Sequence, residues 1–249
     1  MGRLDGKTAV VTGAGGGIGK EIAYAFAAEG AQLAFLDNNG ELVSAAAAGA
    51  PGARGRAYVC DVSDRVAVLE AVDSFARDAG GLDILVNNAV HFHYAPLVDM
   101  DEDVVDKMIA VGLKGALWSL QAATPHLIAR GGGSVINLSS IAVSFSIRNA
   151  GVYTAIKGAL DALTRQQAVE LGPHHIRVNA LAPGPVATPG ASSVIDEQGW
   201  ESRRLRTPLG RLASASEIAS AAVFLASDEG ASIAGVTLKI DGAITVCGP

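Results

Sequence analysis

Short runs of apolar and β-branched residues alternate with longer stretches of helical character along the whole 249-residue chain. Most of these runs are nearly continuous, which is typical of parallel strands covered by helices on both faces. Seven runs are predicted as strands: Thr8–Thr12, Gln32–Leu36, Arg56–Cys60, Ile84–Asn87, Ser134–Leu138, Arg177–Leu181 and Thr237–Ile240. The alternation predicts an α/β fold with a doubly wound, seven-stranded parallel sheet.

The segments between these strands are predicted as the covering helices. They are Gly19–Glu29, Glu41–Ala48, Asp64–Ala79, Asp101–Gln121, Ala150–Leu171 and Ser216–Ala226. No repeat or linker divides the chain, so we expect residues 1–249 to form a single domain. Pro185–Leu209 shows no clear periodicity, and a long loop in a compact domain is usually functional, so we expect a substrate lid at residues 185–210.

Composition and charge argue against several classes of function. The net charge of −6 disfavours a nucleic-acid partner, which normally requires a basic face. Two cysteines, Cys60 and Cys247, are too few for a disulfide framework and fit a reducing compartment. We find no apolar signal region at the start and no apolar run long enough to cross a membrane. A cytoplasmic protein without a membrane partner is therefore expected.

A glycine-rich turn, Thr12–Gly19, follows the first predicted strand and opens a helix. Glycine lets the backbone turn sharply and approach a ligand closely. The helix N-terminus that follows offers free N–H groups and a partial positive charge to a pyrophosphate. Gly13, Gly17 and Gly19 fit the pattern T-G-x-x-x-G-x-G rather than G-x-G-x-x-G. These features favour a dinucleotide site over the alternative, a merely flexible turn.

Asp37 ends the second predicted strand about twenty residues after the glycine turn. An acid at this place accepts hydrogen bonds from the adenosine ribose, and such a bond contributes on the order of 1.5–3 kcal/mol. A 2′-phosphate would instead meet a carboxylate, and no Arg or Lys lies in Gly13–Gly19 or directly beside Asp37. We therefore expect NAD(H) to be preferred over NADP(H). The alternative is a surface aspartate in a turn with Asn38 and Asn39.

Tyr153 and Lys157 stand four residues apart in a predicted helix, which places them on one face. A tyrosine has a pKa near ~10 and is a poor base at neutral pH. An ammonium some 5–6 Å away stabilises the phenolate by roughly 3 kcal/mol at an effective dielectric of about 20, which lowers the pKa by about two units. Tyr153 is thus a candidate general base for an alcohol and general acid for a ketone. The alternative is an unpartnered surface pair.

Taken together, the short motifs of this chain resemble those of the short-chain dehydrogenase/reductase family over nearly the whole length. Each motif is short, but their joint order and spacing are specific. The matching pieces are Thr12–Gly19, Asp61-Val62, Asn87-Asn88-Ala89, Ser140, Tyr153-x-x-x-Lys157, Pro183-Gly184 with Thr188, and Asp241-Gly242. The resemblance implies one Rossmann-like domain, a small-molecule alcohol or ketone as substrate, and assembly as a homotetramer.

The resemblance also implies roles for individual residues. Ser140, rather than its neighbour Ser139, would hydrogen-bond the substrate oxygen beside Tyr153, and Lys157 would also bind ribose hydroxyls. Asp61 would contact the adenine amino group, and Thr188 would hold the carboxamide of the nicotinamide. The full set expected to bind the cofactor is Gly13, Gly15, Gly17, Ile18, Gly19, Asp37, Asp61, Val62, Asn88, Ala89, Tyr153, Lys157, Pro183, Gly184, Val186 and Thr188.

The chain departs from the family pattern at Gly112. Many members carry there a fourth catalytic residue, an Asn that holds a water between the lysine and solvent. Glycine has no side chain for this purpose, although a water could fill the gap. The departure motivates an alternative from another class, a non-catalytic dinucleotide-binding redox sensor. The presence of Ser140, Tyr153 and Lys157 opposes it.

Substrate identity is weakly encoded. By family likeness the substrate pocket would include His91, His93, Ala142, Phe145, Asn149 and Trp200. Two histidines in a loop without a nearby acid cluster are a weak metal signal, so no metal site is expected. Arg203, Arg204 and Arg206 could attract an anion or form a solvated helix face. A 3-oxoacyl carrier-protein reductase is an alternative enzyme, but it typically prefers NADPH, which Asp37 disfavours.

Overall fold

The computed structural model describes residues 2–193 and 195–247. In this part of the chain, seven parallel strands form one sheet in the order β3-β2-β1-β4-β5-β6-β7. The strands are β1 (Thr8–Thr12), β2 (Gln32–Asp37), β3 (Gly55–Val59), β4 (Ile84–Asn87), β5 (Gly133–Leu138), β6 (Ile176–Pro183) and β7 (Thr237–Ile240). The predicted seven-stranded parallel sheet is confirmed: three strands have the predicted bounds, and the ends of the other four differ by one or two residues.

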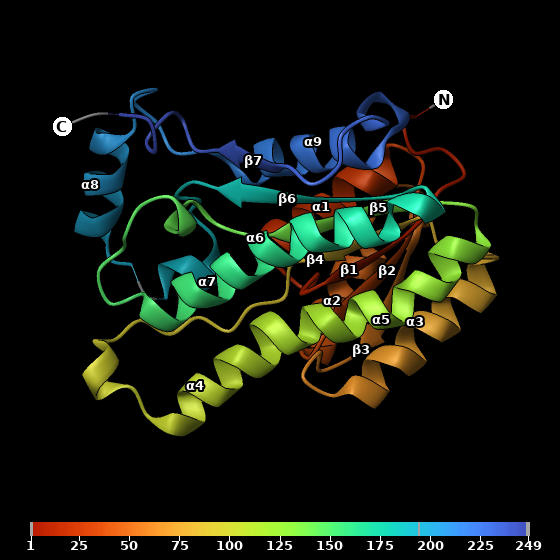
Figure 1. The fold of residues 1–249 in the computed structure, drawn as a ribbon, viewed down its shortest axis with the longest axis horizontal. Coiled ribbons are helices and arrows are strands. Elements are labelled where there is room, and N and C mark those ends of the chain that lie inside the picture. The colour runs from red at the N-terminus through yellow and green to blue at the C-terminus, as the bar shows by residue number, and fades with distance from the viewer. Residues whose placement is uncertain (1, 194, 248–249) are drawn as a thin grey trace.

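Helices cover both faces of the sheet (Figure 1). Their bounds are α1 (Gly17–Ala28), α2 (Gly40–Ala48), α3 (Arg65–Ala79), α4 (Glu102–Ile109), α5 (Gly115–Ala129), α6 (Gly151–Leu171), α7 (Pro189–Ser192), α8 (Glu197–Arg206) and α9 (Ala215–Ala226). Side chains of α1, α2 and α9 share one buried apolar cluster, and side chains of α3, α5 and α6 share a second. Because the five inner strands, β2, β1, β4, β5 and β6, contribute residues to both clusters, these strands are apolar on both faces.

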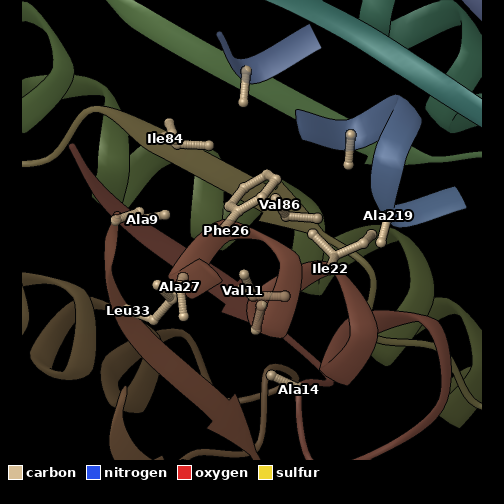
Figure 2. Close-up of a cluster of buried hydrophobic side chains, with 14 of the residues drawn as sticks. Ala9, Val11, Ala14, Ile22, Phe26, Ala27, Leu33, Ile84, Val86 and Ala219 are labelled. Carbon is tan, nitrogen blue, oxygen red and sulfur yellow. The ribbon is translucent and has the colours of Figure 1, made fainter. Parts of the chain in front are cut away.

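The packing of α1 onto the sheet fixes the place of the glycine turn. Ile22 and Phe26 on α1 are fully buried against Val11 of β1 and Val86 of β4, close to Ala219 of α9 (Figure 2). Burying a side chain of this size contributes roughly 1.5–3 kcal/mol. The start of α1 is therefore held at the carboxyl end of β1, where the glycine turn lies.

Strand register brings the predicted site residues to one edge. In β1, Thr12 pairs with Leu36 of β2, and Val11 pairs with Val86 of β4. Asn87 of β4 pairs in turn with Asn137 of β5. The strand order reverses between β1 and β4, and ligands of such sheets bind in the crevice at this point, outside the carboxyl ends of the strands.

Two expectations about helices are wrong. The segment expected as one helix over Asp101–Gln121 consists of α4, a π-helical turn at Ala110–Lys114, and α5, which continues to Ala129 with Pro125 inside it. The segment Pro185–Leu209 is not a structureless loop, because α7 and α8 occupy much of it. Both helices lie at the end toward which β6 and β7 point (Figure 1).

Candidate active site

A cleft of about 870 Å³ lies at the carboxyl edge of the sheet. One end is lined by Gly15 and Asp37, and the other by Tyr94 and Trp200, with Tyr153 also in its wall. A volume of this size lies within the range of roughly 300–1,000 Å³ that is usual for ligand sites. The cleft joins the two regions that the sequence singled out, the glycine turn and the Tyr-Lys pair.

The glycine turn is closed against the loop after β4. Asn88 Nδ2 donates hydrogen bonds to the carbonyl oxygens of Thr12 and Gly13, each at 3.0 Å. A Cβ at Gly13 would lie 2.9 Å from this Nδ2, and one at Gly19 only 2.4 Å from it. Gly13 and Gly17 also have positive φ angles of 65° and 55°. The turn therefore requires glycine for both space and backbone conformation.

The N-terminus of α1 faces the cleft with its amides available. Gly16 precedes the helix and, within the described residues, no side chain caps it. A Cβ at Gly16 would meet no atom within 4 Å. Free N–H groups and the helix dipole suit this end to a phosphate group.

Asp37 is tied to the glycine turn rather than to the solvent. Its Oδ2 accepts a hydrogen bond from the Gly15 N–H at 3.0 Å, and its Oδ1 accepts one from the Asn39 N–H at 3.0 Å. A Cβ at Gly15 would lie 2.9 Å from Oδ2. The carboxylate is thus held in a fixed orientation in the wall of the cleft, next to Asn38.

Asp61 and Val62 follow β3 and line the cleft. The Asp61 carboxylate accepts hydrogen bonds from the Ser63 hydroxyl at 2.7 Å and from Lys107 Nζ at 3.1 Å. The hydrogen bonds from Ser63, together with Lys107, hold the pKa of Asp61 below its usual value against the effect of burial. Lys107, on α4, was not predicted from the sequence as a neighbour of the cleft.

The end of β6 and the segment that follows it form another part of the cleft wall. Pro183, Gly184, Val186 and Thr188 all line the cleft. A Cβ at Gly184 would lie 2.7 Å from the Asp241 Cα, so this crossing permits only glycine. Thr188 caps α7 by accepting a hydrogen bond from the Ala191 N–H at 3.2 Å. Its Cβ lies 3.5 Å from where a Cβ of Gly17 would stand, so the start of α7 lies beside the glycine turn.

Ser140, Tyr153 and Lys157 converge on the same cleft. Lys157 Nζ lies 5.7 Å from the centroid of the Tyr153 ring and donates a hydrogen bond of 2.5 Å to the Leu138 carbonyl oxygen. The Ser140 hydroxyl neighbours the Tyr153 phenol. Ser139 instead donates its hydroxyl hydrogen bond to the Lys157 carbonyl oxygen at 3.2 Å. Of the two serines, Ser140 thus lies beside the phenol.

Burial has the largest effect on the pKa values of Tyr153 and Lys157. It raises the pKa of the Tyr153 phenol, against a smaller lowering by the Ser140 hydroxyl. It also lowers the pKa of Lys157 to about 8. The expectation of a lowered phenol pKa is therefore not met in this structure, because burial has the largest effect on the phenol.

Gly112 lies inside the π-helical turn and is buried. A Cβ at this position would stand 2.9 Å from Cγ2 of Ile156, the residue before Lys157. Ile156 is itself buried in an apolar cluster that includes Met108 and Tyr153. An isoleucine methyl group therefore occupies the space beside Gly112 that a side chain at 112 would need.

The expected substrate residues separate into two groups. His91 and Trp200 line the cleft. The others are not among its lining residues in the described chain: His93, Ala142, Phe145 and Asn149. Ala142 packs in the buried cluster around Tyr153, and Asn149 has a positive φ of 64° just before α6.

Two aromatic residues of the loop after β4 were missed. Phe92 stacks on Tyr153 with ring centroids 5.6 Å apart, and Tyr94 meets Tyr153 edge-on, also at 5.6 Å. Phe92 further approaches Gly190 of α7, where an added Cβ would lie 3.6 Å from its ring. The alternation of His and aromatic residues over 91–94 was the available signal, because every second side chain of an extended loop points the same way.

Among residues 2–193 and 195–247, no group of three or more His, Cys, Asp or Glu side chains is placed to hold a metal ion. None of the helices described is both long and apolar enough to cross a membrane.

The chain is similar in sequence to proteins of known family. A family model described as enoyl-(acyl carrier protein) reductase matches residues 13–245. D-threitol dehydrogenase of Mycolicibacterium smegmatis is 39% identical over 98% of this chain and 95% of its own length.

Solved structures agree with this result. One is a 7α-hydroxysteroid dehydrogenase complexed with NADH and 7-oxo glycochenodeoxycholic acid, with a TM-score of 0.92, 33% identity, and coverage of 96% of this chain and 94% of that one. Another is a gluconate 5-dehydrogenase from Burkholderia cenocepacia in complex with NADP and tartrate, with a TM-score of 0.93, 35% identity, and coverage of 99% and 98%. By its sheet, its motifs and these relatives, the chain belongs to the short-chain dehydrogenase/reductase family.

Proposed function

We propose that the protein transfers a hydride between NAD(H) and a secondary alcohol or its ketone, with Tyr153 as the general acid and base. The observation that carries this proposal is that Ser140, Tyr153 and Lys157 share one cleft with the glycine turn. All three relatives described above are dehydrogenases by name, which supports the same class of reaction.

The residues of the cleft fit a dinucleotide. The open space at Gly16, the uncapped start of α1 and the fixed Asp37 carboxylate suit a pyrophosphate and a ribose. Asp61, Val62, Asn88, Ala89 and Thr188 are proposed to complete this site. A bound nicotinamide supplies the carbon that accepts or gives the hydride.

The protein's own groups move the proton. In alcohol oxidation, Tyr153 takes the hydroxyl proton of the substrate as the carbinol hydrogen leaves as hydride, and in ketone reduction Tyr153 returns it. Ser140 holds the same oxygen by a hydrogen bond. Lys157, with a pKa of about 8, is mostly protonated at neutral pH, so its charge stabilises the phenolate when it forms.

Replacing Tyr153 by Phe tests the acid-base role. The substitution keeps the ring that packs against Phe92 and removes only the hydroxyl group. We expect kcat to fall by about 10²–10⁴-fold, the usual contribution of general acid-base catalysis, while NADH binding by fluorescence titration is unchanged. Substantial turnover by this variant would contradict the assignment, and NADH binding without any turnover by the wild-type protein would favour the redox-sensor alternative.

We further propose that Asp37 makes NAD(H) the preferred cofactor. A 2′-phosphate would meet this fixed carboxylate, and the loss of ribose hydrogen bonds is worth about 1.5–3 kcal/mol. Asp37→Ser should therefore reduce the ratio of kcat/KM for NAD(H) over NADP(H) by about 10–100-fold. Glu41→Gln is the matched control, since this acid lies at the start of α2 and is not in the cleft wall. A wild-type protein that uses both cofactors equally would refute the proposal.

The alternative of a 3-oxoacyl carrier-protein reductase is tested by the same assay. That activity typically goes with NADPH, which Asp37 disfavours. Acyl thioesters should therefore be poorer substrates than simple secondary alcohols and ketones with NAD(H).

A further inference from the structure

Arg203 is a cation in the wall of the cleft that hydride transfer does not require. It lies on α8 and lines the cleft with Trp200, Tyr94 and Phe92. Tyr94 is in edge contact with Tyr153, and the Arg203 charge lowers the pKa of Tyr94 against the stronger effect of burial. Arg203 therefore belongs to the end of the cleft beyond Tyr153, opposite to Asp37 and the glycine turn.

The guanidinium group is held in place but is not neutralised. Its Nη1 donates a hydrogen bond to the Gly199 carbonyl oxygen at 2.9 Å, and its central carbon lies 5.9 Å from the Trp200 ring centroid. Within residues 2–193 and 195–247, no carboxylate lies within 4.0 Å of it. The neighbouring acid, Asp196, uses its Oδ1 to accept a hydrogen bond from the Gly199 N–H at 2.7 Å.

The other two arginines of α8 behave differently. Arg204 forms an ion pair with Glu201, and both side chains are exposed. Arg206 is exposed and does not line the cleft. Arg203 is half-buried, and this separates it from the solvated helix face that the sequence also allowed.

The walls around Arg203 are mainly apolar. Besides the aromatic residues, Ile147 and Ile195 line this end of the cleft. A half-buried guanidinium without a carboxylate partner gains from an anion placed beside it, because solvent screens the pair less there than at the open surface. Its planar donors match the two oxygens of a carboxylate. We propose that the substrate carries a carboxylate remote from its reacting hydroxyl or carbonyl group, and that Arg203 binds this carboxylate.

This inference rests on the proposed hydride transfer, and its test compares charged and neutral forms of one carbon skeleton. The probes are levulinate and its longer straight-chain homologues, each beside its methyl ester, in NADH-dependent reduction. The wild-type protein should prefer the acids. Arg203→Gln should lower kcat/KM for the acids by about 10–100-fold, the size of a lost charge-assisted hydrogen bond, and change the esters by less than about threefold. Arg206→Gln, on the same helix, should change neither.

Binding without turnover supplies a second measurement. Trp118→Phe leaves Trp200 as the only tryptophan, since the chain has two. In the NADH-loaded protein, glutarate should perturb Trp200 fluorescence saturably, and glutaramide should not. Arg203→Gln should abolish the glutarate response.

The outcomes separate two kinds of failure. If esters and simple ketones are reduced as well as the acids, or if Arg203→Gln affects both forms equally, the carboxylate inference is wrong while hydride transfer stands. If no ketone is reduced although NADH binds, the proposed function fails and the inference fails with it.

Discussion

Gly112 and Ile156 form a matched pair of residues beside the catalytic lysine. A Cβ added at Gly112 would lie only 2.9 Å from Cγ2 of Ile156. Because glycine has no Cβ, the Ile156 methyl group fits there. Ile156 shares an apolar cluster with residues of α4, among them Met108 and Val105. The surroundings of position 112 are therefore apolar, whereas the family usually has an amide side chain at this position.

Restoring Asn at position 112 should therefore destabilise the protein. Gly112→Asn forces Ile156 or the π-helical turn to shift, which typically costs about 1–3 kcal/mol of unfolding free energy. Ile156→Ala removes the conflicting methyl group, so the cost of Gly112→Asn should shrink in that background. Urea unfolding of the four proteins of this double-mutant cycle measures the coupling. Equal costs in both backgrounds would show that the two residues do not compete for space.

Sequence reasoning predicted which residues line the cleft where chemistry demands a residue type at a fixed spacing. Tyr153 and Lys157 are one helical turn apart, and Asp37 ends a strand, so their placement follows from local geometry. The stacking of Phe92 on Tyr153 and the contact of Gly112 with Ile156 join segments far apart in the chain. Side-chain packing between such segments leaves no periodic signal in the sequence.

Among the helices, α7 and α8 are the elements held most loosely. None of their described residues is buried, in contrast to α1 or α9. Of the two, α8 carries Trp200 and Arg203 of the cleft wall. Local caps therefore contribute much of what keeps α8 in place, and elements of this kind open at low free-energy cost.

Removing the cap of α8 should affect catalysis more than stability. Asp196→Ala deletes the hydrogen bond from the Gly199 N–H, a change that typically costs about 1 kcal/mol of helix stability. We expect KM for the substrate to rise several-fold, while the midpoint of global unfolding changes little. Asp64→Ala at the start of α3 is the control, because it removes the capping aspartate of another helix. If both variants lower global stability equally and leave KM unchanged, α8 is not a separately mobile part of the site.

Element ends were hardest to predict where composition and packing disagree. The sequence predicts a helix that begins at Asp101 and ends at Gln121. In the structure, α5 continues through Pro125 to Ala129, because Ala123 and Leu127 are buried against the sheet. Conversely, α8 is largely polar and includes Gly199, so it shows no apolar face. Its signal was the capping aspartate, Asp196.

At the scale of the whole molecule, the alternation of strands and helices was sufficient to predict the sheet, because parallel strands require crossover helices on both faces. That pattern does not give the strand order β2-β1-β4, which makes neighbours of the strands that lead to Asp37, Thr12 and Asn88. Folding also removes one lysine side chain from solvent. Lys157 is only 3% exposed and has its pKa lowered from 10.5 to about 8.

The buried lysine predicts how global stability depends on pH. Between pH 8 and 10.5, the unfolded chain binds a proton at Lys157 that the folded protein does not bind, so this residue makes stability rise with pH through the window. The shift corresponds to about 3 kcal/mol. Two groups act in the opposite sense at higher pH: the Cys60 thiol, whose pKa burial raises from 9.0 to about 11, and the Tyr153 phenol, whose pKa lies above 10.0.

Lys157→Met isolates the lysine from these opposing groups, because they are common to both proteins. The variant avoids the cost of burying a charge at neutral pH, whereas at high pH the wild-type lysine is itself neutral. The unfolding free energy of Lys157→Met minus that of the wild type should therefore fall by about 3 kcal/mol between pH 7 and 10.5. Urea unfolding of both proteins without cofactor, in steps across this range, measures the difference. A difference that stays constant with pH would mean that Lys157 keeps its ordinary pKa in the folded protein, and that its charge is solvated rather than buried beside Tyr153.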